Sequence, residues 1–420
     1  MAIESTTGTV GVRVRPTSAF LPYAALLSTI GLLASDMYLP SLERIRLYFR
    51  SDAGEVALSL SLYMAGFAAA QFVYGALSDQ VGRKPPLLFG LCVFVVGTIG
   101  CVTASDIERF LAFRVVQSIG VGAAYVLWQP MVFDLFEGEA LDRLFSRLMA
   151  IGSLSPALAP VVGGYLSSAF GWRSVFWLLA ALGSALVAIT WLAQPESLPA
   201  AARRPFSMRG LLGQYGGLFA DRFFLGYAGA LACGIGTYFV YVAMLPLILS
   251  RLGFMPNAIG LMSLPIVATF ILGTEVSRRQ KARLGPRRSC LLGAALGLLG
   301  ACTLLVATLL DASSPWVLIP PAMIVTFGNG FLLPAGTAYL IECYSTSAGA
   351  VASAVGLLTA LAAALSTLLA SRLISDLGAN AMSGTALLFA VLMNVSLRGS
   401  GSGRPAAGDA RGPGADATRV

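Results

Sequence analysis

The chain has 420 residues, of which 57% are hydrophobic and only 11% are charged, and its mean hydropathy is +0.79. A soluble protein carries about 25% charged residues, so the composition excludes a soluble fold, while recurring apolar runs exclude a disordered chain. The sequence contains no histidine, which excludes histidine-ligated metals and serine–histidine or cysteine–histidine catalysis. A polytopic membrane protein is the class that remains.

A transmembrane helix needs about 20 apolar residues to cross roughly 30 Å of hydrocarbon. The sequence therefore predicts an all-helical protein with twelve spans, of which the last is the shortest. In chain order they are 19–40, 55–77, 86–104, 109–134, 146–170, 173–194, 223–250, 256–277, 289–310, 315–341, 347–374 and 381–397.

Lys and Arg residues orient these spans, because they concentrate in cytoplasmic loops. With both termini in the cytoplasm, the inner loops and tails hold 20 of the 28 basic residues, the outer loops hold seven, and Arg114 lies within a span. We predict an N-in/C-in topology from this distribution. The net charge of +8 is then a topology signal, and we expect no nucleic-acid partner because no basic patch is interleaved with aromatic residues.

The longest inner connection divides the spans into six and six. The segment GRKPPLL at 82–88 joins spans 2 and 3, and the similar GPRRSCLL at 285–292 joins spans 8 and 9. This repeat predicts two pseudo-symmetric six-helix bundles facing a central cavity, as in many secondary transporters. The predicted regions are a cytoplasmic tail (1–18), an N-terminal bundle (19–194), a cytoplasmic linker (195–222), a C-terminal bundle (223–397) and a disordered cytoplasmic tail (398–420).

The six cysteines show no CxxC spacing, and five of them fall within spans. Such residues pack as small apolar side chains. We therefore expect no metal site, no disulfide and no cofactor.

Four segments carry a family resemblance. The loop GALSDQVGRK (75–84), the span 4 segment LAFRVVQSIGVG (111–122) and the span 5 segment SPALAPVVGG (155–164) resemble motifs of the major facilitator superfamily. The segment DMYLP (36–40) is similar to the Bcr/CflA branch, the bicyclomycin and chloramphenicol exporters.

The chain departs from the family pattern at three places. Gln80 stands where the loop motif usually has arginine, and Ala159 where the span 5 motif usually has glycine. Multidrug relatives also carry a second acid on span 1, and here that position is near Ser28 and Thr29. The resemblance implies a drug:proton antiporter of the bacterial inner membrane, with the span 5 motif accompanying export.

Asp36 is the one carboxylate that lies clearly inside a predicted span. A charge there costs about 2.5–3.5 kcal/mol on insertion scales, and burial favours the protonated form of a carboxyl group. Asp36 is therefore the candidate proton carrier. The alternative is that it only caps or hydrogen-bonds near the end of the helix, four residues before Pro40.

Arg114 lies at a similar predicted depth in span 4, so it is the candidate coupling partner of Asp36, directly or through water. A guanidinium keeps its charge and favours the ionised form of a nearby carboxylate, so moving it away would promote proton uptake. The alternative is a static buried ion pair.

Polar and aromatic residues of spans 1, 2, 4 and 7 are candidate substrate-binding residues. On span 4, three of them share an arc of about 80° with Arg114, and one residue of span 1 shares the face of Asp36. Aromatic pockets with few polar groups favour bulky, semi-apolar ligands, although a single tyrosine is equally compatible with helix packing. The candidates are Thr29, Tyr63, Gln71, Gln117, Tyr125, Trp128, Tyr238 and Tyr241.

Two further segments are candidate gating motifs. In the loop between spans 2 and 3, Asp79 can pair with Arg83 or accept hydrogen bonds from a helix N-terminus of the other bundle, while Gly75 and Gly82 permit close approach and a tight turn.

In span 5, two prolines predict a bend and the glycines that follow predict close helix packing. These residues are Pro156, Pro160, Gly163 and Gly164. At the inner end of span 8, Glu275 predicts an interfacial ion pair with the arginines at 278 and 279, with proton coupling as the alternative.

We expect a monomeric transporter, not an enzyme, that exports small amphipathic compounds by alternating access in exchange for protons. Its partners are then the transported compound, protons and membrane lipids. One alternative keeps the fold and transports a metabolite, such as a sugar, nucleoside or siderophore, outward or inward. A membrane-embedded enzyme or a sensor is the other, and the lack of a dense acid cluster or an ATP-binding loop argues against it.

Overall fold

The computed structural model describes residues 20–203, 216–310, 314–345 and 348–400, and the regular structure within these ranges is helical. Eleven helices in these ranges are long and apolar enough to cross a membrane, so the expected all-helical membrane class is confirmed. The predicted N-terminal tail, residues 204–215 of the predicted linker and residues 401–420 of the predicted disordered tail lie outside the described residues.

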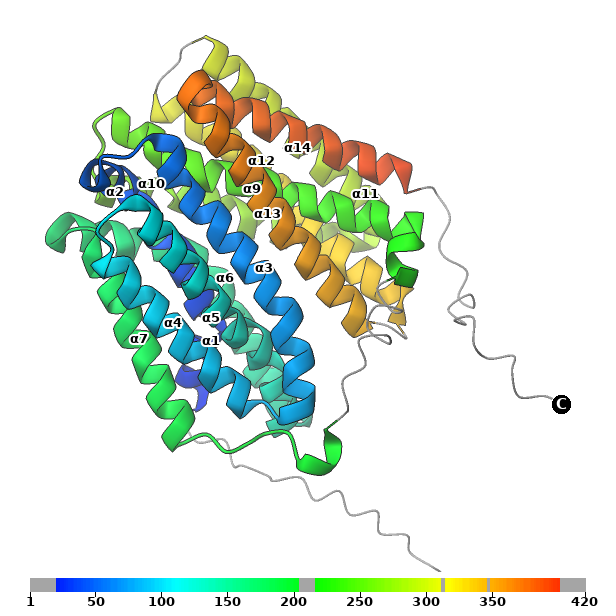
Figure 1. Ribbon diagram of the computed structural model, residues 1–420. Helices are drawn as coiled ribbons and strands as arrows, with labels where there is room; N and C mark the ends of the chain where they lie inside the picture. The colour runs from blue at the N-terminus through cyan, green and yellow to red at the C-terminus, as the bar shows by residue number, and fades with distance from the viewer. Residues whose placement is uncertain (1–19, 204–215, 311–313, 346–347, 401–420) are drawn as a thin grey trace, which may run out of the picture.

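Figure 1 shows the helices in two groups, which we call the N-half and the C-half. The N-half consists of α1 (Phe20–Asp36), α2 (Leu42–Phe49), α3 (Ala53–Val81), α4 (Lys84–Thr103), α5 (Ile107–Leu135), α6 (Gly138–Phe170) and α7 (Arg173–Leu192). The C-half consists of α9 (Arg222–Arg251), α10 (Pro256–Met262), α11 (Leu264–Leu309), α12 (Pro315–Cys343), α13 (Ala348–Leu377) and α14 (Ala379–Gly399). Short 3₁₀ turns lie at Leu39–Ser41 and Ala200–Ala202.

The first span is interrupted, where the sequence predicts one helix over 19–40. Helix α1 ends at Asp36, the 3₁₀ turn Leu39–Ser41 follows, and α2 continues to Phe49. Pro40 lies at the start of the turn. Because proline lacks a backbone N–H, Pro40 cannot donate the helical hydrogen bond to the Asp36 carbonyl, which agrees with the end of α1 at this residue.

The expected spans 256–277 and 289–310 are joined, which is why eleven candidate helices stand where twelve spans were predicted. The merged segment runs over Pro256–Leu309, and inside α11 the backbone leaves helical geometry only at Gly285, with φ 69° and ψ 169°. Residues 278–288 are mostly Arg, Lys, Ala and Leu, which are strong helix formers. Pro286 begins the next helical section, where its missing N–H is not needed.

The last span is longer than expected. Helix α14 has 21 residues, and at 1.5 Å per residue it extends over about 32 Å. It is therefore long enough to cross the hydrocarbon core.

Acidic side chains fix the starts of three spanning helices. Asp52 and Glu55 form a capping box at α3, while Asp106 caps α5 and Asp221 caps α9. Each carboxylate accepts a hydrogen bond from an otherwise unpaired N–H of the first turn. The caps set where the long helices begin and thereby the positions of their functional residues along the helix axes.

The two halves meet where α6 packs against α10, in a contact that we call the outer seam (Pro160, Gly164, Pro256 and Gly260). A Cβ atom placed on Gly164 would lie 2.3 Å from the Pro256 carbonyl oxygen, and one on Gly260 would lie 2.3 Å from that of Pro160. Only glycine allows backbones to approach so closely. The seam is therefore a reciprocal backbone contact between the halves.

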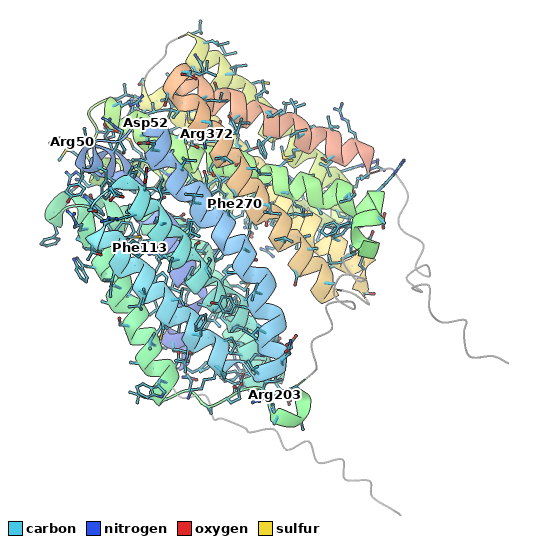
Figure 2. The ribbon with its side chains drawn as sticks, in the orientation of Figure 1. Arg50, Asp52, Phe113, Arg203, Phe270 and Arg372 are labelled. Carbon is cyan, nitrogen blue, oxygen red and sulfur yellow. The ribbon has the colours of Figure 1, made fainter. Side chains whose placement is uncertain are left out.

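A second contact joins α3 and α13 at the same end of the molecule, where a Cβ atom on Gly54 would lie 2.5 Å from the carbonyl oxygen of Ser371. Figure 2 places Arg50 and Arg372 at this end and Arg203 at the opposite end. The first two belong to the predicted outer loops and the third to the predicted linker. In Figure 1 the two groups of ribbons diverge toward the inner end, so the halves are joined on the outer side.

Candidate functional site

Asp36 lies where span 1 is broken. Its side chain is 6% exposed, and its Oδ1 accepts a hydrogen bond of 2.7 Å from Ser35 Oγ. The neighbouring turns of α1 are mostly apolar. A carboxyl group is thus held inside the membrane region with one side-chain hydrogen bond from the described part of the chain.

Arg114 lies in the interior of α5 and is completely buried. Its Nη1 donates a hydrogen bond of 3.1 Å to the Ala34 carbonyl and another to Gln117 Oε1. The guanidinium carbon lies 4.2 Å from the ring centroid of Tyr38 and 4.3 Å from that of Tyr63. The N-half therefore surrounds this permanent charge with aromatic faces and oxygen acceptors, which attract a cation.

Asp36 and Arg114 are neighbours without forming an ion pair in the described structure. Arg114 binds the carbonyl of Ala34, two residues before Asp36, and its Nε and Nη2 have no hydrogen-bond partner in the described part of the chain. A buried donor without a partner costs about 1–3 kcal/mol. The predicted proximity is present, and two guanidinium nitrogens keep unused capacity to bind an oxygen.

A pocket lies between the two halves next to Asp36. Its cavity volume is about 60 Å³, and the pocket is partly open. The N-half contributes Asp36, Leu39, Pro40, Pro156 and Pro160 to its wall, and the C-half contributes residues of α9, α10 and α11. Asp36 is the only acidic or basic side chain among the lining residues. A change in its charge therefore acts on a space that both halves share.

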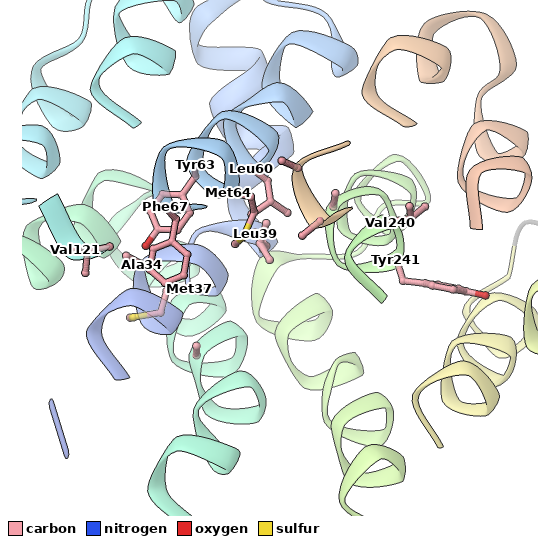
Figure 3. Packing of buried hydrophobic residues seen from close by; sticks show 14 of the residues in the cluster. Ala34, Met37, Leu39, Leu60, Tyr63, Met64, Phe67, Val121, Val240 and Tyr241 are labelled. Atoms are coloured by element: carbon pink, nitrogen blue, oxygen red, sulfur yellow. The ribbon is translucent and has the colours of Figure 1, made fainter. Parts of the chain in front are cut away.

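Two of the predicted substrate-binding residues, Tyr238 and Tyr241, line this pocket opposite Asp36. Figure 3 shows Tyr241 extending from α9 on the side away from the cluster that contains Tyr63 and Phe67. The Tyr241 hydroxyl is buried and has no hydrogen-bond partner in the described part of the chain. The C-half therefore supplies aromatic side chains to a pocket with one acid.

The other six predicted binding residues do not line this pocket: Thr29, Tyr63, Gln71, Gln117, Tyr125 and Trp128. Three of them form hydrogen bonds inside the N-half. Thr29 donates to the Ala25 carbonyl at 2.8 Å, Tyr63 donates to the Gly31 carbonyl at 2.8 Å, and Gln117 donates to Thr98 Oγ1 at 2.9 Å. Their polar groups are already paired, so they need no ligand.

The remaining three pack against other helices. Tyr125 lies against Phe67 with ring centroids 4.9 Å apart, and Trp128 stacks on Phe145 at 5.8 Å. Gln71 lies beside Gly356 of α13. In this structure Gln117 and Trp128 of the predicted polar arc of span 4 are buried within the N-half, whereas Tyr125 is 39% exposed. That the arc faces the cavity stays a prediction.

Helix α6 both lines the pocket and packs closely against the break in span 1. Pro156 and Pro160 line the pocket, and both lie inside one helix of 33 residues. A Cβ atom on Gly163 would lie 1.7 Å from the Met37 carbonyl oxygen, so α6 touches the chain directly after Asp36. Movement of α6 would therefore displace the break in span 1.

The inner loop between α3 and α4 is held by charged side chains of the N-half. Arg83 contacts Asp79 at 2.6 Å, Ser78 Oγ at 2.7 Å and Asp134 at 3.2 Å. Gly82 has φ 101°, a conformation that favours glycine. Of the two predicted partners of Asp79, the structure thus shows Arg83. The other glycine of the motif, at 75, lies near Val126 of α5.

Sequence reasoning missed Asp134 and Glu196 in this network. The Glu196 carboxylate accepts hydrogen bonds from the backbone N–H of Arg83 at 2.7 Å and of Lys84 at 3.2 Å, and so caps α4. Lys84 Nζ in turn donates to the Gln194 carbonyl at 2.7 Å, beyond the end of α7. The sequence signal that could have found Glu196 is the position of an acidic residue just after a predicted span, at the start of the linker.

Glu275 at the inner end of span 8 contacts Arg278 at 2.8 Å and Arg279 at 2.6 Å. All three side chains are at least one third exposed. This is the interfacial ion pair expected from the sequence, and it lies apart from the pocket.

Comparison with known proteins gives a family and a fold. The sequence profile of the Major Facilitator Superfamily matches residues 24–367. Multidrug resistance protein D of Escherichia coli is 29% identical over 342 residues, which cover 79% of this chain and 83% of that protein. The uncharacterized MFS-type transporter YdgK of Bacillus subtilis is 33% identical over 256 residues, 59% of this chain and 64% of that protein.

Among solved structures, a bacterial homologue of the human lysosomal transporter Spinster, in an inward-facing and unoccupied conformation, aligns with a TM-score of 0.75. The two chains are 14% identical, and the alignment covers 91% of this chain and 96% of the other. At this identity the likeness concerns the fold alone.

Proposed function

This chain belongs to the major facilitator superfamily, a family of transporters and not of enzymes, and from that premise we propose that it exports small amphipathic compounds in exchange for protons. In this proposal a monomer of the Bcr/CflA type works by alternating access in the bacterial inner membrane. Asp36 carries the proton and Arg114 is its coupling partner.

One observation carries the proposal: among the described residues that line the pocket between the halves, Asp36 is the only carboxylate, and none is basic. An ionised carboxylate in an apolar pocket is unfavourable unless it is paired. Protonation or a bound ligand removes that penalty. Because both halves form the pocket, the state of Asp36 changes the free energy of the contact between them.

Arg114 supplies the second part of the proposed coupling. It keeps its charge throughout the cycle. Its Nε and Nη2 have no hydrogen-bond partner in the described part of the chain, and its Nη1 binds the Ala34 carbonyl, two residues before Asp36. In the proposed cycle, the ionised Asp36 carboxylate turns toward these nitrogens, and the protonated form returns to the pocket. Substrate and proton then compete for Asp36, and each weakens the binding of the other by the same factor.

The pocket wall supports an amphipathic compound as substrate. Apart from Asp36, its polar side-chain groups are those of Ser263 and the two tyrosines, and the other lining residues are apolar. Such walls favour bulky, semi-apolar ligands. The name of the Escherichia coli relative, a multidrug resistance protein, is consistent with a substrate of this class.

The metabolite alternative demands a more polar pocket. A sugar or nucleoside needs several hydrogen-bonding partners, because a buried polar group without one is costly. An anionic metabolite needs a basic group, but Arg114 is buried inside the N-half and does not line the pocket. Both features favour neutral or cationic amphipathic compounds.

The driving force is sufficient for the proposed exchange. A membrane potential of 100 mV contributes about 2.3 kcal/mol per charge that crosses. One proton moving inward therefore sustains an outward gradient of a neutral compound of roughly fiftyfold.

Ligand-induced proton release tests the proposal. Purified protein in detergent and weak buffer is mixed with chloramphenicol or ethidium, and the pH change and the binding are recorded together. We expect the wild type to release protons and Asp36→Asn to release none while still binding ligand. Glu275→Gln, which removes an exposed carboxylate, should behave as the wild type.

Two results would contradict parts of the proposal. Binding to the wild type without proton release would exclude proton coupling at Asp36. Failure of every amphipathic ligand to bind would favour the metabolite alternative.

A further inference from the structure

The surface of the C-half carries an apolar groove that the transport proposal does not use. It has a volume of about 390 Å³ between α11 and α12, and its lining includes Leu296, Leu299, Met323 and Phe327. Leu299 is 52% exposed. Its only polar lining residue, Thr269, donates its hydroxyl hydrogen bond within the C-half. The groove therefore offers an apolar surface to the membrane.

A stripe of exposed residues connects this groove with the inner end of α11. Arg288, Leu292, Ala295 and Leu299 are all exposed, and their spacing of four, three and four residues puts them on one helix face. Leu299 lies about 16 Å along the helix from Arg288. Half of a hydrocarbon core of about 30 Å is about 15 Å. The stripe thus covers the depth that an acyl chain of the inner leaflet reaches.

The inner end of the stripe carries unpaired positive charge. Among the basic residues 278–288, Arg278 and Arg279 pair with Glu275. The other four are exposed and make no ion pair or side-chain hydrogen bond with the described part of the chain. They are Lys281, Arg283, Arg287 and Arg288. By contrast, the corresponding Arg83 of the N-half is fully engaged by acids and a hydroxyl.

We propose that one anionic phospholipid of the inner leaflet binds at this place, with its phosphate on Arg287 and Arg288 and one acyl chain along the stripe into the groove. Arginine binds phosphate through paired N–H groups. A helical section also begins after Gly285, and the positive end of its dipole favours the same anion. The outer connection of α11 and α12, residues 310–314, contains no Lys or Arg, so an outer-leaflet lipid lacks this partner.

Native mass spectrometry with purified, delipidated protein tests the site. Phosphatidylglycerol is added in parallel with phosphatidylcholine of identical acyl chains, and the fraction of protein that carries one lipid is measured. We expect the wild type to retain one phosphatidylglycerol and little phosphatidylcholine. At about 1 kcal/mol per basic residue near the headgroup, the double variant Arg287→Ala/Arg288→Ala should bind phosphatidylglycerol roughly thirtyfold more weakly.

Matched control variants distinguish lipid binding at this site from general effects of surface charge and side-chain size. Arg143→Ala/Arg147→Ala removes two exposed inner arginines from α6 and should retain the lipid. Leu299→Trp fills the groove and should lose it, whereas Leu388→Trp, at an exposed leucine of α14, should not. Glycerol phosphate, which has no acyl chain, should not displace the bound lipid.

The proposal is overturned by equal retention of the two lipids, or by unchanged retention in either the double arginine variant or Leu299→Trp. Displacement by glycerol phosphate would show a free-phosphate site and overturn it as well. If the arginine variant does not fold, Leu299→Trp decides. None of these outcomes depends on whether the protein exports drugs.

Discussion

The two halves share an architecture and a loop motif but differ in what they bury. In the part of the chain that the structure describes, the buried residues among Asp, Glu, Lys and Arg are Asp36 and Arg114, and both belong to the N-half. The buried polar residues of the C-half are Ser, Thr and Asn. In the proposed mechanism the halves therefore differ in role: the N-half carries the group whose charge changes, and the C-half supplies an apolar and aromatic wall.

The inner loops show a second difference. In the N-half, Gly82 lies against the Glu196 carboxylate, which would be 2.4 Å from a Cβ atom there. In the C-half, a Cβ atom on Gly285 would meet nothing within 4 Å. A repeated sequence motif therefore serves as a side-chain network in one half and as an open, basic helix junction in the other.

Among the variants that test this difference between the halves, we expect the largest effect from Arg114→Lys. The guanidinium is planar, so it binds the Ala34 carbonyl and Gln117 while it stacks between two tyrosine rings; the compact ammonium group of lysine cannot do both. A buried lysine also readily loses its charge. We expect proton-driven efflux from proteoliposomes to fall at least about tenfold, with the ligand still bound in detergent. Arg143→Lys, at an exposed ion pair, is the control and should leave efflux unchanged. Wild-type efflux by Arg114→Lys would mean that this arginine only packs the N-half.

An intermediate effect is expected from Gly164→Ala at the outer seam. The added Cβ would meet the Pro256 carbonyl at 2.3 Å, and such overpacking costs about 1–3 kcal/mol. The halves should separate on the outer side, which spin labels placed at positions 50 and 372 of a cysteine-free background would report as a longer distance. Gly152→Ala on the same helix meets nothing within 4 Å and should keep the short distance. No lengthening in Gly164→Ala would show that the seam does not hold the halves together.

The smallest effect concerns corresponding helices of the two halves, α5 and α12. The backbone N–H of Arg109 donates to the Asp106 carboxylate and lowers its pKa, with a further contribution from Ser105, whereas Ser314 at α12 makes no side-chain cap. Because the folded pKa is depressed, the stabilisation is present above the unfolded value of about 3.9 and is lost as the pH falls through the folded value.

Asp106→Ala should therefore lower the melting temperature slightly at pH 7, and this difference should shrink in acid. Ser314→Ala should change nothing at either pH. Thermal unfolding at pH 7 and pH 3 measures both variants. A pH-independent loss in Asp106→Ala would mean that packing, and not the charge of the cap, stabilises the start of α5.

Composition and hydropathy predicted the helical class because hydrocarbon imposes length and apolarity on every span. Asp36 was found for the same reason, since a carboxylate in an apolar run is conspicuous. The surroundings of Gln117 and Trp128 could not be derived from the sequence, because a helix face tells which side chains point together, but not whether a cavity or another helix lies opposite. Glu196 was missed because its partner Arg83 lies 113 residues away in the sequence, and one sequence does not show such contacts.

The outer seam has a consequence for how the protein senses its surroundings. Its contacts join glycine to carbonyl oxygen, and the hydrogen bond that accompanies them, from the Asn257 N–H to Ser168 Oγ, is neutral. A joint without charged groups is insensitive to the ionic strength and acidity of the external medium. The outer seam therefore does not respond to the external medium through its own contacts, and in the proposed mechanism its opening is controlled by Asp36.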